Sequence, residues 1–206
     1  MVIAVLTAVF GCSDDKTSET PATTSRGAVT TVPATTLDSS VRLLADGLGT
    51  VSFGAPADAA ATALRNALGV PESDTTVVAD MPDGLGGPRT TLRTLRWGQL
   101  AVSFVDWTGS PYRSDGTLHL VRWLVSGQTN NGREYATPEG IRIGSSVAQL
   151  REAYGSSMVV ERDDCVGAWQ IRVGNPSLGL VGRLDSNSEN ANARLVYLAA
   201  GLRSSC

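Results

Sequence analysis

Histidine, cysteine and excess positive charge are scarce in this chain of 206 residues, and each shortage excludes a class of function. One histidine and three cysteines leave no cluster of cysteines, histidines and carboxylates at the spacing of a metal site. We therefore expect no metal and no other cofactor. The chain has 17 lysines and arginines and 20 aspartates and glutamates, which gives a net charge of −3. Without a basic surplus for phosphate backbones, nucleic acid is not an expected partner.

Long apolar runs are also missing, apart from a short one at the start of the chain. No stretch approaches the roughly 20 apolar residues that a membrane-spanning helix needs. Residues 1–11 are mostly apolar and end in Phe10-Gly11 before Cys12, and a polar tract follows. A small residue before a cysteine at the end of a signal-like segment is typical of a bacterial lipoprotein precursor. We predict lipid attachment at Cys12 and an anchor in the cell membrane, on its extracytoplasmic face.

The leader carries no lysine or arginine ahead of its apolar run, so residues 1–11 correspond to a truncated lipoprotein signal peptide. We infer that Met1 is an internal start codon and that the precursor begins upstream. The alternative is a buried N-terminal strand, Val2 to Phe10. That alternative is less favoured, because a core strand seldom leads directly into a long polar tract.

The segment that follows, residues 12–36, is rich in threonine, serine and proline and contains almost no large apolar side chain. Such a segment cannot bury enough surface to offset the entropy of ordering it. We predict a mobile tether between the lipid and the folded part.

The two remaining cysteines, Cys165 and Cys206, form an even pair in a chain expected outside the reducing cytoplasm. We predict a disulfide between them. Closing a loop of roughly 40 residues stabilises by about 3–4 kcal/mol in the chain-entropy model. The alternative is that the two cysteines bind a metal ion, but the sequence offers no cluster of further ligands to complete such a site.

The rest of the chain shows a weak internal repeat, with units at 37–130 and 131–206. In each unit a short strand, within Gly47 to Gly54 and then Gly140 to Gly144, leads into a helix that ends at a glycine. The first helix follows Pro56 and buries alanines and leucines between Ala60 and Leu68. The second begins at Ser146, which has capping-box spacing to Gln149, and presents Val147, Leu150 and Tyr154 on one face before Gly155.

After each helix the hydrophobic period changes to two, which predicts antiparallel strands. The fold class predicted is α+β, with two tandem helix-then-antiparallel-meander repeats and helices packed on one face of the sheet. The tryptophans of these strands are expected to pack in the core or on the sheet face. The expected strands are Leu92 to Trp97, Leu100 to Val105, Leu118 to Val125, Trp169 to Val173, Leu178 to Leu184 and Leu195 to Ala199.

Residues 137–155, TPEGIRIGSSVAQLREAYG, resemble the second-repeat motif of a group of actinobacterial secreted lipoproteins of unknown function. The plan of that group is lipobox, Ser/Thr/Pro linker, two repeats and a terminal cysteine, so the resemblance covers nearly the whole chain. The repeat layout is also similar to beta-lactamase inhibitory protein and to small outer-membrane assembly lipoproteins of the SmpA/OmlA type. This second resemblance implies a scaffold that binds proteins.

Two loop aromatics are the candidate binding surface. Trp107 and Tyr112 lie in a Gly/Pro-containing segment between two predicted strands, which suits contact with a protein or glycan. The alternative is that Trp107 folds back over the sheet edge.

His119 alternates with Leu118 and Leu120, so its side chain is expected on the exposed side of the sheet. No serine or cysteine has the surroundings of an activated nucleophile that could complete a triad with it.

These observations favour a non-enzymatic binding module over an enzyme. We expect a monomer, anchored to the membrane by its lipid, that binds an unidentified envelope protein or polymer on the open sheet face or through the Trp107 to Tyr112 loop. The alternative is an envelope-associated hydrolase. That reading requires titratable groups converging in a pocket, and the sequence does not indicate any.

Overall fold

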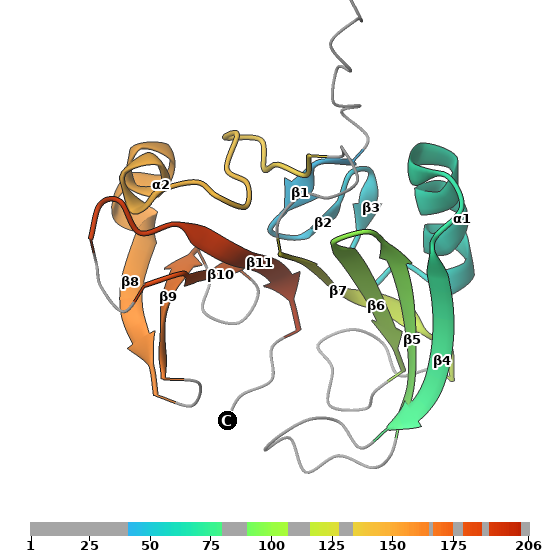
Figure 1. Cartoon of the computed structure of the whole chain (residues 1–206). Helices are drawn as coiled ribbons and strands as arrows, with labels where there is room; N and C mark the ends of the chain where they lie inside the picture. Colours follow the sequence, from blue (N-terminus) through green and yellow to red (C-terminus); the bar gives the residue numbers. More distant parts are fainter. Residues whose placement is uncertain are drawn as a thin grey trace, which may run out of the picture. The chain divides into compact units, whose positions relative to one another are not determined.

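The computed structural model describes residues 41–79, 90–106, 116–127, 134–164, 167–174, 179–186 and 190–202, which belong to the compact unit Thr36–Cys206. Over these residues the fold is α+β, with a large antiparallel sheet, a small three-stranded sheet and few helices (Figure 1).

Along the chain, the small sheet comes first and each helix is then followed by four strands (Figure 1). The first series is β1 (Leu43–Leu44), β2 (Gly47–Leu48), β3 (Val51–Ser52), α1 (Ala57–Leu68), β4 (Ser73–Ala79), β5 (Thr90–Trp97), β6 (Leu100–Val105) and β7 (His119–Ser126). The second is α2 (Val147–Tyr154), the 3-10 helix η2 (Gly155–Ser157), β8 (Met158–Asp163), β9 (Ala168–Val173), β10 (Leu180–Leu184) and β11 (Leu195–Gly201).

The large sheet has the strand order β4-β5-β6-β7-β11-β10-β9-β8. Its two centre strands, β7 and β11, are the last strands of the two series and pair antiparallel, with Leu198 opposite Val125 and Ala200 opposite Trp123. The outermost strands, β4 and β8, are the ones that directly follow the two helical segments.

Helix α1 forms where the sequence predicts it. Asp58 lies in its first turn and Arg65 in its last, as the helix dipole favours. Its buried stripe includes Ala60, Leu64 and Leu68 as expected, with Ala57 and Ala61 in addition. Ala63 and Ala67, which also fall within the expected stripe, are only half-buried, so the buried face is centred closer to Ala57 and Ala61 than the sequence predicts.

Helix α2 begins with the predicted capping box. The Ser146 backbone N–H donates to Oε1 of Gln149 at 2.8 Å, and the Gln149 N–H donates to Oγ of Ser146 at 3.3 Å. These two bonds satisfy donors that an uncapped first turn leaves free. Val147 and Leu150 are buried and Tyr154 is half-buried. Gly155 ends the helix with a φ of +53°, which glycine adopts without strain.

The six strands expected from the sequence are present, with ends that differ by two residues or fewer. Two strands of the large sheet, β4 and β8, were not predicted. Both lie at its edges, where the alternation of buried and exposed residues is weak: Val77 is 51% exposed and Val159 is 50% exposed. The segment 140–144 is irregular and ends in a turn, and it does not form the short strand expected. The region from Gly47 to Gly54 contains two short strands, β2 and β3, in place of one.

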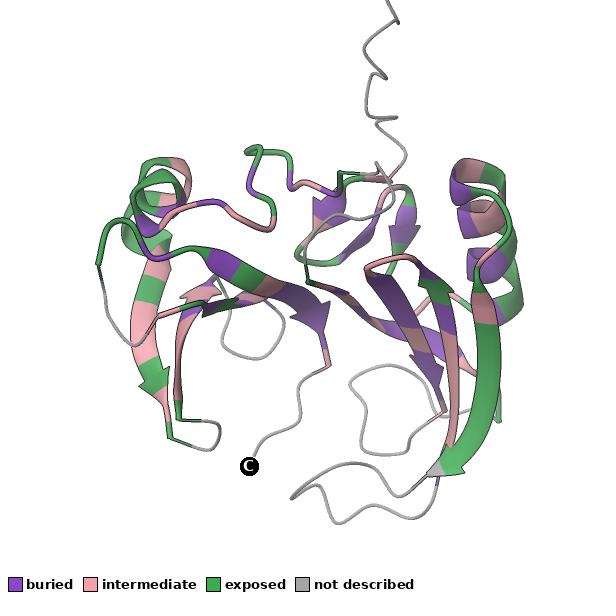
Figure 2. Cartoon of the chain, viewed as in Figure 1, coloured by how far each residue is buried: buried purple, intermediate pink, exposed green. Residues whose placement is uncertain are grey.

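One main hydrophobic cluster contains residues from both helices, from β1–β3 and from one face of the large sheet. The predicted core position of Trp97 and Trp123 is confirmed, since both are buried and each indole N–H donates to a backbone carbonyl. Trp123 donates to Leu44 at 2.8 Å and Trp97 to Gly69 at 2.9 Å. Trp169 is half-buried and packs against the same cluster. Figure 2 shows the buried residues concentrated in the middle strands, whereas β4 is largely exposed.

An ion-pair network joins α1 to β4 and β5. Arg93 pairs with Asp74 at 2.8 Å and with Asp58 at 3.1 Å, and Arg65 pairs with Asp74 at 2.9 Å. The hydrogen bonds from Arg93 and its charge, together with Arg65, hold the pKa of Asp74 below its usual value despite partial burial. The carboxylate therefore stays ionised to a lower pH than an aspartate without these partners.

Candidate functional site

A row of polar side chains crosses four neighbouring strands of the large sheet, β8 to β11, on the face opposite Val160, Ile171, Gly182 and Leu198. In the register of the strands, Tyr197 of β11 lies opposite Arg183 of β10, Arg183 opposite Gln170 of β9, and Gln170 opposite Glu161 of β8. Residues directly opposite on antiparallel strands have neighbouring side chains on one face. We call these four residues the cross-strand row.

Two contacts join neighbouring members of the row in pairs. The guanidinium of Arg183 lies 5.4 Å from the centre of the Tyr197 ring, within the range of a cation–π interaction. The side-chain amide of Gln170 donates to Oε1 of Glu161 at 2.9 Å. Each contact reduces the rotamer freedom of its members, so less conformational entropy remains to be lost when a partner binds.

An additional arginine contacts each end of the row. Arg122 of β7 donates from Nη2 to the Tyr197 hydroxyl, and Arg172 of β9 donates from Nη2 to Oε2 of Glu161. Arg172 and Glu161 keep 34% and 29% of their side-chain surface exposed. The row and its two flanking arginines therefore combine partial exposure with fixed orientation.

The charge of this group is predominantly positive, because three arginines accompany one glutamate. Guanidinium groups present several N–H donors in a fixed plane and suit carboxylate and phosphate groups. Tyrosine and arginine are also the side chains that most often dominate the energy of protein interfaces. Chemically, the arrangement can bind an acidic or hydrogen-bond-accepting surface.

None of the site residues predicted from the sequence belongs to this group. Cys12, Trp107, Tyr112, Cys165 and Cys206 lie outside the residues that the structure describes. Lipid attachment, the disulfide and the aromatic loop therefore stay predictions.

His119 lies on the sheet face opposite Leu120, as its alternation predicts, but it is buried there and not exposed. Its side chain was expected on the exposed side of the sheet, whereas the residue is 3% exposed. The reason is that the start of β7 lies between two neighbours: His119 pairs with Val105 of β6 and forms a bridge with Pro56. The hydroxyl of Thr117 lies 3.2 Å from its Nε2 atom.

The described residues hold no cluster of three or more histidines, cysteines and carboxylates placed to bind a metal ion. Within the same ranges, no helix has the length and apolar character to cross a membrane.

Sequence reasoning missed the cross-strand row, although its signal is present. Arg172, Arg183 and Tyr197 each lie between two apolar or small residues of a predicted strand. Their side chains therefore fall on one face once the strands are aligned. The alignment required the strand order and the edge strand β8, which had not been predicted.

Three comparisons with known proteins found no match. No protein-family model matches the sequence, and no curated protein and no solved structure is significantly similar to it.

Proposed function

We propose that this chain is a membrane-anchored extracytoplasmic lipoprotein whose folded unit is a non-enzymatic binding module for a protein or cell-envelope polymer. The observation that carries the proposal is the cross-strand row with Arg122 and Arg172 at its ends. Its donors predict a partner surface that is acidic or rich in hydrogen-bond acceptors. A displayed, half-exposed set of arginine and tyrosine side chains is typical of a recognition surface.

The order of the strands supports a duplicated architecture for the module. Each helix precedes four antiparallel strands, and the two final strands, β7 and β11, meet at the centre of the sheet. We infer two tandem helix-then-meander repeats whose helices share one sheet face. The joint presence of α1 and α2 residues in one hydrophobic cluster supports this arrangement.

The binding proposal is tested by site-specific photocrosslinking in intact cells. A photoreactive amino acid replaces Gln170, in the middle of the row, and in a matched control it replaces Glu152, which is exposed on α2. We expect a discrete cross-linked species from position 170 and none from position 152. Equal products at both positions, or no product at position 170, would contradict the proposal.

The predicted membrane anchor is tested by cell fractionation. Cys12→Ala is expected to move the protein from the membrane fraction to the soluble fraction, because acylation would be lost. A soluble fraction no larger than that of the wild type would contradict anchoring at Cys12.

Thiol titration of the same soluble material tests the predicted disulfide. Two free thiols, at Cys165 and Cys206, would exclude it.

A further inference from the structure

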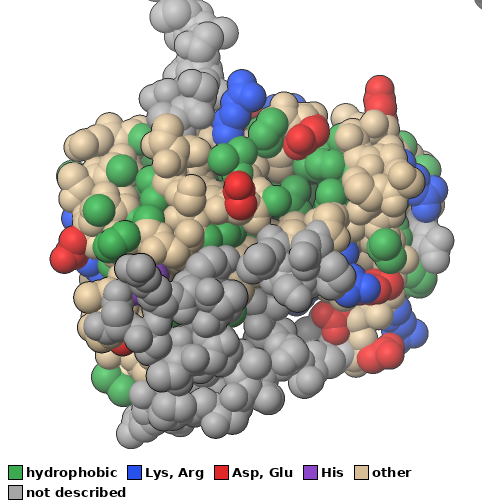
Figure 3. All heavy atoms as spheres, turned by 180° about the vertical axis from the view of Figure 1, so that it is seen from behind, with side chains coloured by type: hydrophobic (Ala, Val, Ile, Leu, Met, Phe, Trp, Pro, Cys, Tyr) green, Lys and Arg blue, Asp and Glu red, His purple; other side chains and the backbone are tan. Residues whose placement is uncertain are grey.

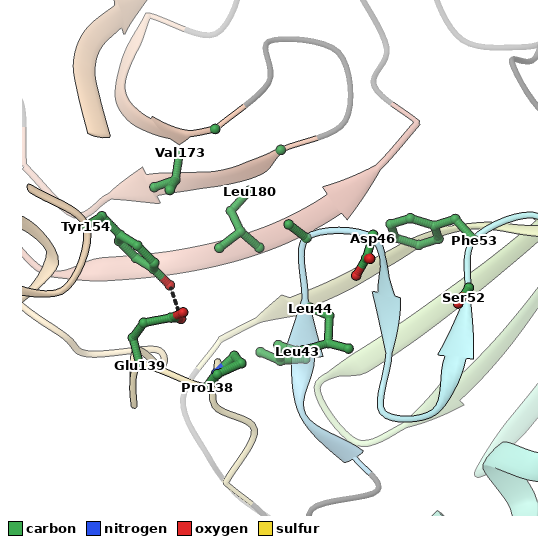
Figure 4. Close-up of a pocket in the computed structure, with 13 residues that line it drawn as sticks. Leu43, Leu44, Asp46, Ser52, Phe53, Pro138, Glu139, Tyr154, Val173 and Leu180 are labelled. Carbon is green, nitrogen blue, oxygen red and sulfur yellow. Dashed lines mark hydrogen bonds between the residues drawn. The ribbon is translucent and has the colours of Figure 1, made fainter. Parts of the chain in front are cut away.

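A pocket of about 650 Å³ lies among the small sheet, the turn at Pro138, the end of α2 and the facing ends of β9 and β10 (Figure 4). Small-molecule sites commonly measure roughly 300–1,000 Å³ and have mainly apolar walls with a few polar groups. The walls here follow that pattern, with side chains from segments far apart in the sequence. The apolar lining includes Leu43, Leu44, Phe53, Pro138, Val173 and Leu180.

The surface of this region combines apolar and acidic groups. Viewed from behind, hydrophobic side chains gather in the upper central part of the molecule, where Figure 1 places β1–β3, and acidic side chains lie among them (Figure 3). Among the described residues that line the pocket, Asp46 and Glu139 are the charged ones, and both are exposed.

Each of these carboxylates lies beside an aromatic ring. Asp46 is next to Phe53 on one side of the pocket, and Glu139 is next to Tyr154 on the other, with Leu43, Leu44 and Leu180 between the two pairs (Figure 4). A carboxylate attracts an ammonium group, and an aromatic face adds a favourable interaction with its charge. The pocket therefore offers an acidic and aromatic site at each end of a hydrocarbon floor.

Tyr154 stays uncharged at neutral pH and orients the carboxylate at its end. Burial, with a further contribution from Glu139, raises the pKa of Tyr154 to about 12 although Thr137 opposes the shift. Its hydroxyl lies 3.2 Å from Oε2 of Glu139, to which it can donate, and 2.9 Å from Oγ1 of Thr137. A carboxylate has two acceptor oxygens, so Glu139 retains capacity for a cationic ligand.

The geometry points to a binding site for an aliphatic diamine, whose hydrocarbon chain lies on the leucines and whose ammonium groups meet Asp46 and Glu139. This site is independent of the cross-strand row, because its walls include Val173 and Leu180, which belong to the main hydrophobic cluster beneath the other face of the sheet.

Isothermal titration of the full chain with matched eight-carbon probes tests the charge requirement. Diaminooctane is expected to bind saturably, octylamine more weakly, and octanediol and octanedioate at least tenfold more weakly than the diamine. Equal or tighter binding of the diol or the dicarboxylate would overturn the proposal, as would the absence of saturable diamine binding. Equal affinity for octylamine and the diamine would overturn a site with two charged ends.

Conservative variants then test whether Asp46 and Glu139 are the carboxylates that bind the ammonium groups. Asp46→Asn and Glu139→Gln are each expected to weaken diamine binding about two- to fivefold, the range of a partly exposed ion pair, without changing octanediol binding. Glu152→Gln removes a carboxylate from α2 outside the pocket and should leave diamine affinity unchanged. Circular dichroism verifies that each variant is folded. Wild-type affinity in both pocket variants, or an equal loss in Glu152→Gln, would contradict the assignment.

Discussion

The two halves of the sheet are built in the same order but filled differently. In the first, β5–β7, the core side chains include Trp97, Phe104 and Trp123, all buried. In the second, β9–β11, the buried side chains are aliphatic and Trp169 is only half-buried. Ile171 and Leu195 pack over Gly182, where strand neighbours approach closely.

This difference indicates that the two halves contribute unequally to stability and to recognition. Most of the cross-strand row and the pocket walls formed by Val173 and Leu180 belong to the second half, whereas the large aromatic anchors belong to the first. We infer that substitutions in the first half act mainly on folding, and that surface substitutions in the second half act mainly on binding.

The largest expected effect comes from the aromatic anchor of the first half. Trp123→Ala should lower the free energy of unfolding by about 3–5 kcal/mol, because it opens a cavity and removes the donor to the Leu44 carbonyl. Urea denaturation followed by circular dichroism measures the loss. Trp123→Phe, which retains most of the volume, is the control. A loss under about 1 kcal/mol for the alanine variant would show that the aromatic half is not the main source of stability.

Overpacking the second half should have the next largest effect. A Cβ atom at position 182 would overlap Leu195 and lie 2.9 Å from Cγ1 of Ile171, so Gly182→Ala should destabilise by about 1–3 kcal/mol. Thermal unfolding of a double-mutant cycle with Leu195→Ala measures the coupling. Purely additive losses would indicate that the strands separate without strain and that the close contact is unimportant.

Removing the cap of α2 should cost about 1 kcal/mol. Ser146→Ala deletes the oxygen that accepts from the Gln149 N–H. The matched variant Ser146→Asp keeps an acceptor there and should retain most of the stability. If the alanine and aspartate variants unfold at the same urea concentration, the capping box does not stabilise this half.

The smallest effect is expected from the ion pairs of α1. Asp74→Asn should lower the unfolding free energy at neutral pH by less than about 1 kcal/mol, as for other partly exposed pairs. Because the folded pKa of Asp74 is below its ordinary value of 3.8, the contribution is present above that value and is lost as pH falls through the folded pKa. The difference between wild type and variant should therefore shrink in acid. Urea titrations across pH that show a constant difference would contradict this account.

Local signals predicted much of this fold. Ser146 and Gln149 identify the start of α2, and a hydrophobic period of two identifies β5 and β6, because these features depend on neighbours within a few residues. The edge strand β4 was missed because its exposed face lacks a hydrophobic period.

The candidate sites depend on contacts that no local pattern contains. The cross-strand row requires the register between Tyr197, Arg183 and Gln170 across three strands. The pocket brings Leu43 together with Leu180, which only the tertiary fold can do. Strand pairing therefore has to be known before either site can be recognised.

The most direct measurement is the photocrosslink yield from position 170 in cells that carry a charge reversal on one face or the other. Arg183→Glu alters the cross-strand row, whereas Arg162→Glu alters an exposed arginine of β8 that alternates with Glu161 and so points to the opposite face. The binding-module account predicts a severalfold loss of cross-linked product for Arg183→Glu and an unchanged yield for Arg162→Glu, with both proteins folded. Unchanged yield in the first variant, or equal loss in both, would contradict recognition through this face.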